Sequence, residues 1–467
     1  MEFPALFESR MRRLLTDDWR DFEAAFHAPL TARGLRANTL KCSVARLREL
    51  FGQPLRPTPF AADGFVIDGV FKAGSDPLHH AGAYYMQEPS AMSAVTVLSP
   101  KVGEQVLDLC AAPGGKSTQI AAALQGQGLL WCNEYVPARA RILAQNIERC
   151  GVRNAAVSCG DTALLAGQLP AFFDAVLADV PCSGEGMFRK EPDALTHWSE
   201  ENIALCAARG QDILQNAAAC VREGGRLVLS TCTFAPEENE WAVVRFLRAH
   251  PEFELLPIQV PFGRPAFDAE RIVPFGTAEE RAFAATVPLT YCRRILPMDG
   301  GEGHFIALFR RMAGGANTPP PFRAPKEGEG VKRCRDLYAD CFADTPTGTF
   351  AAFGDTVRLL PADLPDTRGL TVLGAGIAAA QLHTGRTLRA EPAHALFQSA
   401  QAADCRRLLS FAADDPRLTA FLRGEELTVE AANGYTAVAV AGIVTGFGKV
   451  SGGKLKNHYP KGLRLVG

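Results

Sequence analysis

The chain has 467 residues, so we expect several domains. Its formal net charge at pH 7 is −2, so a positively charged surface for binding nucleic acid can cover only part of the molecule. No stretch is apolar over enough residues to span a membrane, and the N-terminus lacks the apolar core of a signal peptide. The thirteen cysteines contain no C-x-x-C spacing, which argues against a disulfide framework and predicts a cytoplasmic protein without a metal site.

The N-terminal two thirds of the chain contain two predicted units. Residues 1–75 mix helix-like stretches with a strand-like stretch, which indicates a small α+β region. Residues 76–311 alternate short apolar runs with amphipathic helices, a pattern typical of an α/β domain with a parallel sheet. The strands predicted in this domain cover residues 105–110, 128–134, 155–161, 174–180, 226–232 and 304–311.

The remaining chain is predicted to hold a linker and two smaller domains. Residues 312–330 are rich in glycine and proline and are interpreted as the linker. We expect a small intermediate domain over 331–395 and a second small domain over 396–467. The periodicity is less clear here than in the α/β domain, and no internal repeat is present.

A glycine-rich turn joins the first predicted strand of the α/β domain to a helix, within "VLDLCAAPGGKSTQIAAAL". Cys110 stands where a P-loop requires its first glycine, and the dinucleotide pattern G-x-G-x-x-G is absent. A loop for S-adenosylmethionine (SAM) remains, with the free amides at the following helix N-terminus meeting the SAM carboxylate, and a plain tight turn is the alternative. The expected SAM-binding residues are Cys110, Ala111, Ala112, Pro113, Gly114, Gly115 and Lys116.

Four carboxylates follow four successive predicted strands. Asp108 could meet the SAM ammonium group, and Glu134, about 25 residues beyond the loop, is placed to hydrogen-bond the ribose hydroxyls. Asp161 is suited to accept a hydrogen bond from the adenine amino group, and Asp179 ends the fourth strand. The carboxyl ends of parallel strands meet in one crevice, so the series predicts a Rossmann-like SAM-dependent methyltransferase core.

Four motifs together resemble the RNA cytosine-5 methyltransferases of the Nop2/Sun family. They are "YYMQEPSAM" (84–92), "DLCAAPGGKST" (108–118), "DVPCSGEGMFRK" (179–190) and "LVLSTCTFAPEENE" (227–240). The resemblance covers residues 1–311 well. The domain order and the tail are similar to the bacterial branch that acts on 16S ribosomal RNA, the RsmF/YebU type.

The resemblance implies SAM-dependent methylation of carbon 5 of cytosine through a covalent bond between a cysteine and carbon 6. In that family the nucleophile lies in the Thr-Cys motif, here Cys232, while the cysteine of the Pro-Cys pair, Cys182, assists product release. Asp179 is positioned to activate the base at N3. The local dipeptides alone do not decide between the cysteines, because DNA cytosine-5 methyltransferases use the Pro-Cys cysteine. A further sign for Cys232 is "APEENE", a predicted helix start close after it, whose dipole would favour a thiolate.

The C-terminal segment is the expected site of RNA binding. Residues 424–449 resemble the PUA-like domain that ends the bacterial ribosomal RNA enzymes, and the N-terminal region, including "RANTLK" (36–41), is expected to dock RNA. The tail carries basic residues with two interleaved aromatic side chains, His458 and Tyr459, as possible stacking groups. The basic residues are Lys449, Lys454, Lys456, Lys461 and Arg464.

The sequence therefore predicts a monomeric 16S ribosomal RNA (cytosine-5-)-methyltransferase that binds its RNA alone or within the small ribosomal subunit. Three alternatives stay open at this point, one of them a DNA cytosine methyltransferase that uses Cys182, and the other two act on or bind RNA. One is a transfer RNA methyltransferase of the same family, and the other is an RNA-binding ribosome-assembly factor with vestigial catalysis.

Overall fold

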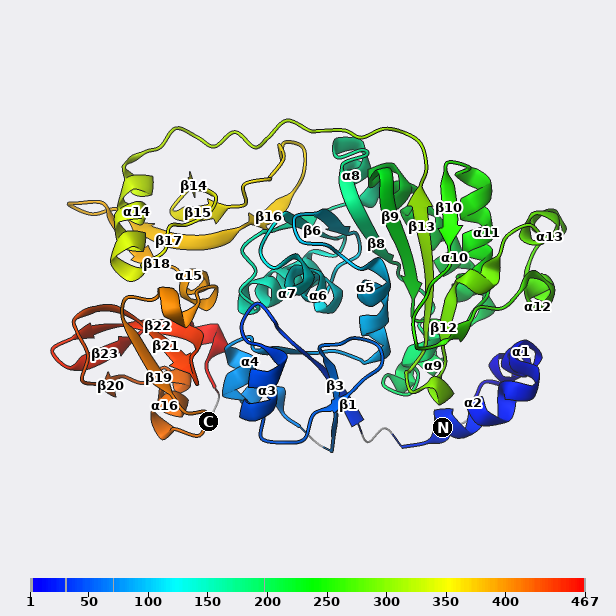
Figure 1. Ribbon diagram of the computed structural model, residues 1–467, viewed down its shortest axis with the longest axis horizontal. Coiled ribbons are helices and arrows are strands. Elements are labelled where there is room, and N and C mark those ends of the chain that lie inside the picture. The colour runs from blue at the N-terminus through cyan, green and yellow to red at the C-terminus, as the bar shows by residue number, and fades with distance from the viewer. Residues whose placement is uncertain (1–2, 30–31, 70, 197, 466–467) are drawn as a thin grey trace.

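The computed structural model describes residues 3–29, 32–69, 71–196 and 198–465 (Figure 1). These residues form an N-terminal region, a large α/β domain and two smaller sheets that follow a long connection. Among the described residues no helix combines the length and apolar character needed to cross a bilayer.

Two helices open the chain and pack against the α/β domain. They are α1 (Ala5–Leu15) and α2 (Trp19–His27), and their apolar side chains belong to the same buried cluster as the sheet. Phe7 contacts Phe188 edge-on, and Phe22 contacts Phe234 in the same way. Both partners lie a few residues beyond the two motif cysteines, so the first helices brace the segments that carry them.

A four-stranded sheet of order β2-β3-β1-β4 completes the N-terminal region. Its elements are β1 (Ala32–Ala37), α3 (Val44–Leu50), β2 (Arg56–Pro57), β3 (Gly64–Asp68), α4 (Pro77–His80) and β4 (Tyr84–Met86). The pairing of β4 with β1 carries this region past the expected boundary at residue 75.

The α/β domain is built on a ten-stranded sheet whose central order is β13-β9-β8-β5-β6-β7. The four pairs among β5 to β9 are parallel, and β13 is antiparallel to β9. The bounds are β5 (Gln105–Asp108), β6 (Leu129–Glu134), β7 (Ala155–Cys159), β8 (Phe173–Asp179), β9 (Val221–Thr231) and β13 (His304–Arg311). β10 (Phe253–Leu256) pairs with β13, and β11 (Arg264–Pro265) and β12 (Arg293–Ile295) extend the sheet beyond it. The expected α/β fold with a parallel sheet is confirmed.

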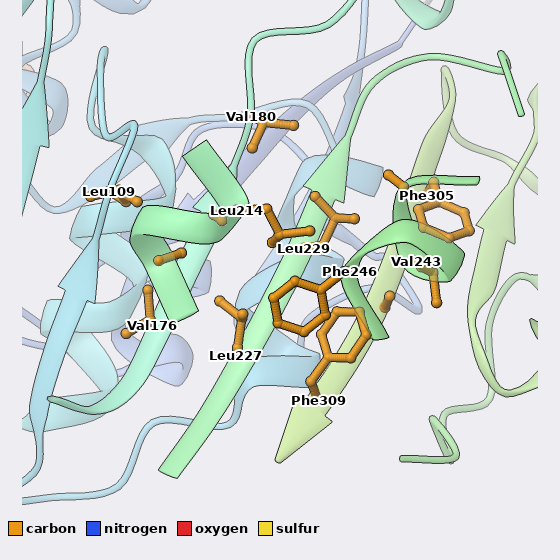
Figure 2. Packing of buried hydrophobic residues seen from close by; sticks show 14 of the residues in the cluster. Leu109, Val176, Val180, Leu214, Leu227, Leu229, Val243, Phe246, Phe305 and Phe309 are labelled. Atoms are coloured by element: carbon orange, nitrogen blue, oxygen red, sulfur yellow. The ribbon is translucent and has the colours of Figure 1, made fainter. Parts of the chain in front are cut away.

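Alternate strand residues point to opposite faces of this sheet, and each face is covered by helices. Leu227 and Leu229 face the cluster with α10 (Glu200–Cys220) and α11 (Glu240–Ala249), as Figure 2 shows. Val228 faces the opposite cluster with α5 (Ser93–Leu98), α6 (Gly115–Leu124) and α7 (Pro137–Arg149). The strand order reverses at β5, which has β6 on one side and β8 on the other, and in such folds ligands bind at the carboxyl ends of the strands beside that point.

Two smaller sheets follow the glycine- and proline-rich connection. The first has the order β14-β15-β17-β18 and the second β19-β21-β22-β23-β20. The bounds are α14 (Glu329–Cys341), β14 (Thr349–Phe353), β15 (Thr356–Leu360), β16 (Val372–Ala375), β17 (Ile377–His383), β18 (Arg389–Pro392), α15 (His394–Gln398), β19 (Leu408–Phe411), α16 (Pro416–Arg423), β20 (Leu427–Thr428), β21 (Gly434–Val440), β22 (Ile443–Ser451) and β23 (Lys454–Asn457). The strand β16 lies in neither of these two sheets. It pairs antiparallel with β7, at the edge of the ten-stranded sheet of the α/β domain, which is called the catalytic sheet below.

The last sheet packs against the N-terminal region, and this contact changes the interpretation of two sequence features. The Tyr459 hydroxyl lies 2.7 Å from His80 Nδ1, and Tyr459 is 2% exposed, so it is a core residue rather than a stacking group for bases. Lys41 is buried as well and donates to the carbonyls of Val444 and Gln398. Arg36, fully buried, donates to Thr118, so the charged side chains of "RANTLK" join domains and do not face RNA.

Candidate active site

The two motif cysteines meet at the carboxyl edge of the catalytic sheet. Cys182 follows β8, Cys232 follows β9, and their sulfur atoms lie 3.2 Å apart. The backbone N–H of Cys232 points at Cys182 Sγ at 3.3 Å. The hydrogen bond with Cys232, together with burial, raises the pKa of the Cys182 thiol well above its ordinary value. Cys182 therefore keeps its proton at neutral pH and can donate it to a thiolate at Cys232.

The helix predicted to start within "APEENE" begins at the last residue of that stretch, Glu240, after a segment of turns from Phe234 onward. Its N-cap, Asn239, hydrogen-bonds the residues on both sides of Cys232, and an effect of the helix dipole on the Cys232 thiol stays a prediction. Glu240 forms a fully buried two-point ion pair with Arg294, which also donates to the Phe234 carbonyl. Removing one member of such a pair costs about 3–5 kcal/mol of stability. This pair fixes the segment between the cysteine and α11.

Asp179, the last residue of β8, binds the lysine of the glycine-rich loop. Lys116 Nζ lies 2.8 Å from Asp179 Oδ2. Burial alone would lower the pKa of Lys116, but the carboxylate of Asp179 more than offsets this, and the pKa lies above its ordinary value. The pair presents an ammonium donor and a carboxylate acceptor close to Cys232, whose thiol also contributes to the raised pKa of Lys116.

The glycine-rich loop leaves a buried carboxylate oxygen unsatisfied. Asp108, at the end of β5, accepts a hydrogen bond from Ser117 Oγ at 2.7 Å on one oxygen. Its other oxygen, Oδ1, is buried and has no hydrogen-bond partner among the described residues. Burial raises the pKa of Asp108 to about 7. An unsatisfied buried acceptor is costly, so this atom fits a ligand that brings a donor or a cationic group.

The backbone of the same loop is shaped for close approach. Gly114 has φ of 112°, a conformation that side chains disfavour, and a β-carbon there would lie 3.2 Å from Leu143. Arg139 and Asn146 of α7 donate to the carbonyls of Ala112 and Pro113, both at 2.9 Å. The loop is therefore held from outside by α7.

The other two expected cofactor carboxylates differ in their surroundings. Glu134, at the end of β6, is 4% exposed, and its Oε1 accepts the backbone N–H of Val136 at 2.9 Å. Asp161 is exposed and caps α8 (Thr162–Gln168) by accepting the backbone N–H of Ala163 at 2.8 Å. One oxygen of each side chain thus holds the backbone at its own strand end.

Four polar residues that the sequence reasoning did not single out surround the cysteine loops. Glu185 and Glu238 are 2% and 4% exposed, and they bind the hydroxyl groups of Thr233 and Ser183. The signal in the sequence is the placement of acids within "SGEG" and "PEENE", next to the cysteines. Acidic residues are rarely buried without a role or a partner, but their burial is visible only in the fold.

A cavity of about 720 Å³ lies between the N-terminal sheet and the Pro-Cys loop. Arg33 lines it from the N-terminal region, and Arg189 and Lys190 line it from the segment after Cys182. Arg189 is paired with Glu302 at 3.2 Å. His304, at the start of β13, is buried with its pKa lowered to about 4 by burial, so it is a neutral residue of the core edge.

The chain matches three family models in order. They are the N-terminal domain of 16S rRNA methyltransferase RsmF over residues 3–89, 16S rRNA methyltransferase RsmB/F over 95–310, and the methyltransferase RsmF PUA domain over 408–465. The ribosomal RNA small subunit methyltransferase F of Vibrio cholerae serotype O1 is 32% identical over 99% of this chain and 98% of its own length. This chain belongs to that family. The expected family and ribosomal RNA methyltransferase activity are confirmed.

Other relatives agree with this assignment. The methyltransferase F of Citrobacter koseri is 38% identical over 69% of this chain and 65% of its own length. A methyltransferase homolog from Pyrococcus horikoshii is 31% identical, with a TM-score of 0.56 over 66% of this chain and 95% of that chain. The structure of NSun6 from Pyrococcus horikoshii with SFG shares the fold, with 20% identity and a TM-score of 0.55 over 67% of this chain and 99% of that chain.

Proposed function

We propose that this ribosomal RNA methyltransferase transfers a methyl group from SAM to carbon 5 of a cytosine in 16S rRNA, through a covalent bond between Cys232 and carbon 6. The observation that carries the proposal is the pair of thiols, 3.2 Å apart, at the carboxyl edge of the catalytic sheet. Carbon 5 of cytosine is too weak a nucleophile until a thiolate adds to carbon 6. Methylation of a hydroxyl group or a ring nitrogen needs no such sulfur.

Each side chain of the site has a step in this chemistry. The Cys232 thiolate attacks carbon 6 while Asp179, supplied by the Lys116 ammonium, delivers a proton to N3. Bound SAM supplies the methyl group that carbon 5 accepts. The carbon-5 proton then passes to solvent, N3 returns its proton to Asp179, and Cys232 leaves as a thiolate that the neutral Cys182 thiol can protonate across the short sulfur–sulfur distance.

The SAM assignment rests on the fit of the glycine-rich loop. Asp108 offers its unsatisfied oxygen to the ammonium group, and Gly114 and Gly115 admit the backbone to the ligand. We assign Glu134 to the ribose hydroxyls and Asp161 to the adenine. The NSun6 structure with SFG, a SAM analogue, supports SAM as the cofactor.

Replacing Gly114 with alanine is expected to lower the affinity for SAM about tenfold. The left-handed backbone costs a side chain about 1–2 kcal/mol, and the added carbon meets Leu143, so the loop must shift. Calorimetric titration with SAM measures this. Gly167→Ala is the matched control, because a β-carbon at Gly167 meets nothing within 4 Å. Equal SAM affinity of the two variants would refute the loop assignment.

Deleting the gene from its host is expected to remove 5-methylcytosine from 16S rRNA at the target position. Bisulfite sequencing of total RNA measures the change, and re-expression of the wild-type chain, but not of a Cys232→Ala variant, restores the modification. Loss of 5-methylcytosine from transfer RNA alone would favour the transfer RNA alternative. No loss from any RNA would favour an assembly factor without activity.

RNA binding is proposed for two surfaces. The cavity lined by Arg33, Arg189 and Lys190, and also by Glu88 and Glu302, reaches the segment that follows Cys182, and we assign its basic side chains to the phosphates beside the target base. The exposed Lys454 and Lys456 lie on β23, and Lys454 forms an exposed ion pair with Glu426 at 3.2 Å. We propose that the target cytosine is unstacked on its way to the thiols, as for other enzymes that modify bases.

A further inference from the structure

Four side-chain oxygens connect the two loops that carry the cysteines. Thr233 Oγ1 lies 2.9 Å from Glu185 Oε2 and 2.7 Å from Ser183 Oγ, which in turn lies 2.5 Å from Glu238 Oε1. Ser183 is the residue after one cysteine, and Thr233 is the residue after the other. The chain Glu185–Thr233–Ser183–Glu238 is therefore a direct link between the Pro-Cys loop and the Thr-Cys loop.

The three contacts in this chain need three protons. The hydroxyl groups of Thr233 and Ser183 supply one proton each, and an ionised carboxylate supplies none. With both glutamates ionised, two of the oxygens would face each other at hydrogen-bond distance without a proton between them. One of the two carboxyl groups must therefore be protonated for all three contacts to be hydrogen bonds.

The surroundings of the two glutamates differ. Glu185 accepts the backbone N–H of Phe234 at 2.9 Å and the indole N–H of Trp198 at 2.8 Å, in addition to Thr233. Burial raises the pKa of Glu185, while these hydrogen bonds and the positive charge of Arg10 favour its ionised form. These three donors occupy both oxygens of Glu185, so the charge belongs there.

At the other end of the chain, Glu238 accepts one backbone N–H, from Ser183 at 2.9 Å, on its second oxygen. The groups that face it are carboxylates and thiols: Glu185, Glu237, Cys182 and Cys206. Neighbouring negative charge and burial both disfavour a second carboxylate here.

We propose that Glu238 is a neutral carboxylic acid that donates its proton to Ser183 Oγ, so that the four-oxygen chain acts as a latch holding the two cysteine loops at their working separation. Ser183 then donates to Thr233, and Thr233 donates to the ionised Glu185. Glu238 is a positioning residue, because in this proposal it contacts neither the target cytosine nor SAM. Its importance for activity rests on the function proposed above.

The latch gives the site a pH limit. Burial raises the pKa of Glu238 to about 8, so the latch is closed at neutral pH and loses its proton as the pH rises through about 8. Because this folded-state pKa is raised, the stability that the proton confers is complete below the ordinary pKa of a glutamate and is lost as the pH rises toward and through 8. Opening separates the loops and with them the two sulfur atoms.

Infrared spectroscopy tests the proton directly, without any substrate. The difference spectrum between the wild-type protein and Glu238→Gln at pH 7 should contain the C=O stretching band of one neutral carboxylic acid, and this band should vanish above about pH 8. Absence of the band at pH 7 would overturn the proposal. Because no turnover is needed, this result is independent of whether the chain methylates cytosine.

Two matched substitutions test the latch in catalysis. Glutamine at 238 can accept the Ser183 N–H through its oxygen and donate to Ser183 Oγ through its nitrogen, as the neutral acid does. Both oxygens of Glu185 accept hydrogen bonds, so a glutamine at 185 must instead direct its N–H group at another hydrogen-bond donor. We expect Glu238→Gln to keep kcat within about threefold of wild type at pH 7 and Glu185→Gln to lower kcat at least about tenfold, with little change in KM for RNA.

The pH profile separates a positioning role from a merely structural one. The ratio of kcat for Glu238→Gln to kcat for the wild type should rise above about pH 8, because the amide cannot lose the latch proton. Thermal unfolding and SAM titration of both variants identify a variant that fails to fold. A constant ratio, or greater damage from Glu238→Gln than from Glu185→Gln, would contradict the latch.

Discussion

Alanine at position 232 is expected to abolish both methyl transfer and covalent attachment to RNA. Without the Cys232 thiolate, carbon 5 of cytosine is never activated, and residual activity should fall at least about a thousandfold. Labelled SAM measures methyl transfer, and RNA containing 5-fluorocytosine measures covalent attachment. A base cannot remove the fluorine on carbon 5 as it removes a proton, so the covalent complex persists and survives denaturing electrophoresis.

The control for this prediction is Cys405→Ala. Cys405 is a half-buried cysteine outside the catalytic domain, so its loss should leave both readouts unchanged. A Cys232→Ala variant that still forms the denaturation-resistant complex would show that another side chain is the nucleophile. Retained transfer without any complex would instead rule out the covalent route.

Alanine at position 182 is expected to have the opposite effect: a covalent enzyme–RNA complex should accumulate even with RNA that contains ordinary cytosine instead of 5-fluorocytosine. In the proposed mechanism, attack by Cys232 does not require Cys182, but departure does, because we assign the proton donor to the neutral Cys182 thiol, 3.2 Å from the leaving sulfur. We expect turnover to fall by about 10²–10⁴-fold, the usual contribution of a positioned acid or base. Denaturing electrophoresis after incubation with RNA and SAM measures the trapped fraction.

The double variant separates the two roles. Cys182→Ala combined with Cys232→Ala should form no complex, since nothing attacks. If Cys182→Ala prevented the complex while Cys232→Ala formed it, the roles of the two cysteines would be reversed. That outcome would match the use of the Pro-Cys cysteine that the local dipeptide alone allows.

The elements that carry chemistry were predictable because their signals are local. Gly114 and Gly115 lie directly after an apolar run, and Asp108, Glu134 and Asp179 each end a strand of the parallel sheet. The parallel order itself follows from the alternation of strands and helices. Such a pattern places the carboxylates at one edge of the sheet without any knowledge of distant contacts.

Features set by distant contacts could not be predicted. Within "APEENE" the helix begins only at Glu240, and the sequence does not show that Glu240 forms a buried pair with Arg294, 54 residues away. Lys41 and Tyr459 look like surface residues in the sequence and are buried where two domains meet. In the sequence, Glu238 looks like one acidic residue of an exposed run. Only the fold shows that its carboxyl group contacts the hydroxyl group of Ser183, in the loop of the other cysteine.

The strand β16 has a consequence for how the catalytic domain can be handled. By pairing with β7, this short segment from beyond residue 311 covers backbone groups at the edge of a large mixed sheet. Uncovered edges of this kind recruit strands from other molecules and lead to aggregation. A chain cut after Arg311 would keep every proposed catalytic residue and lose its protection against self-association, so solubility and catalysis are encoded in different parts of this protein.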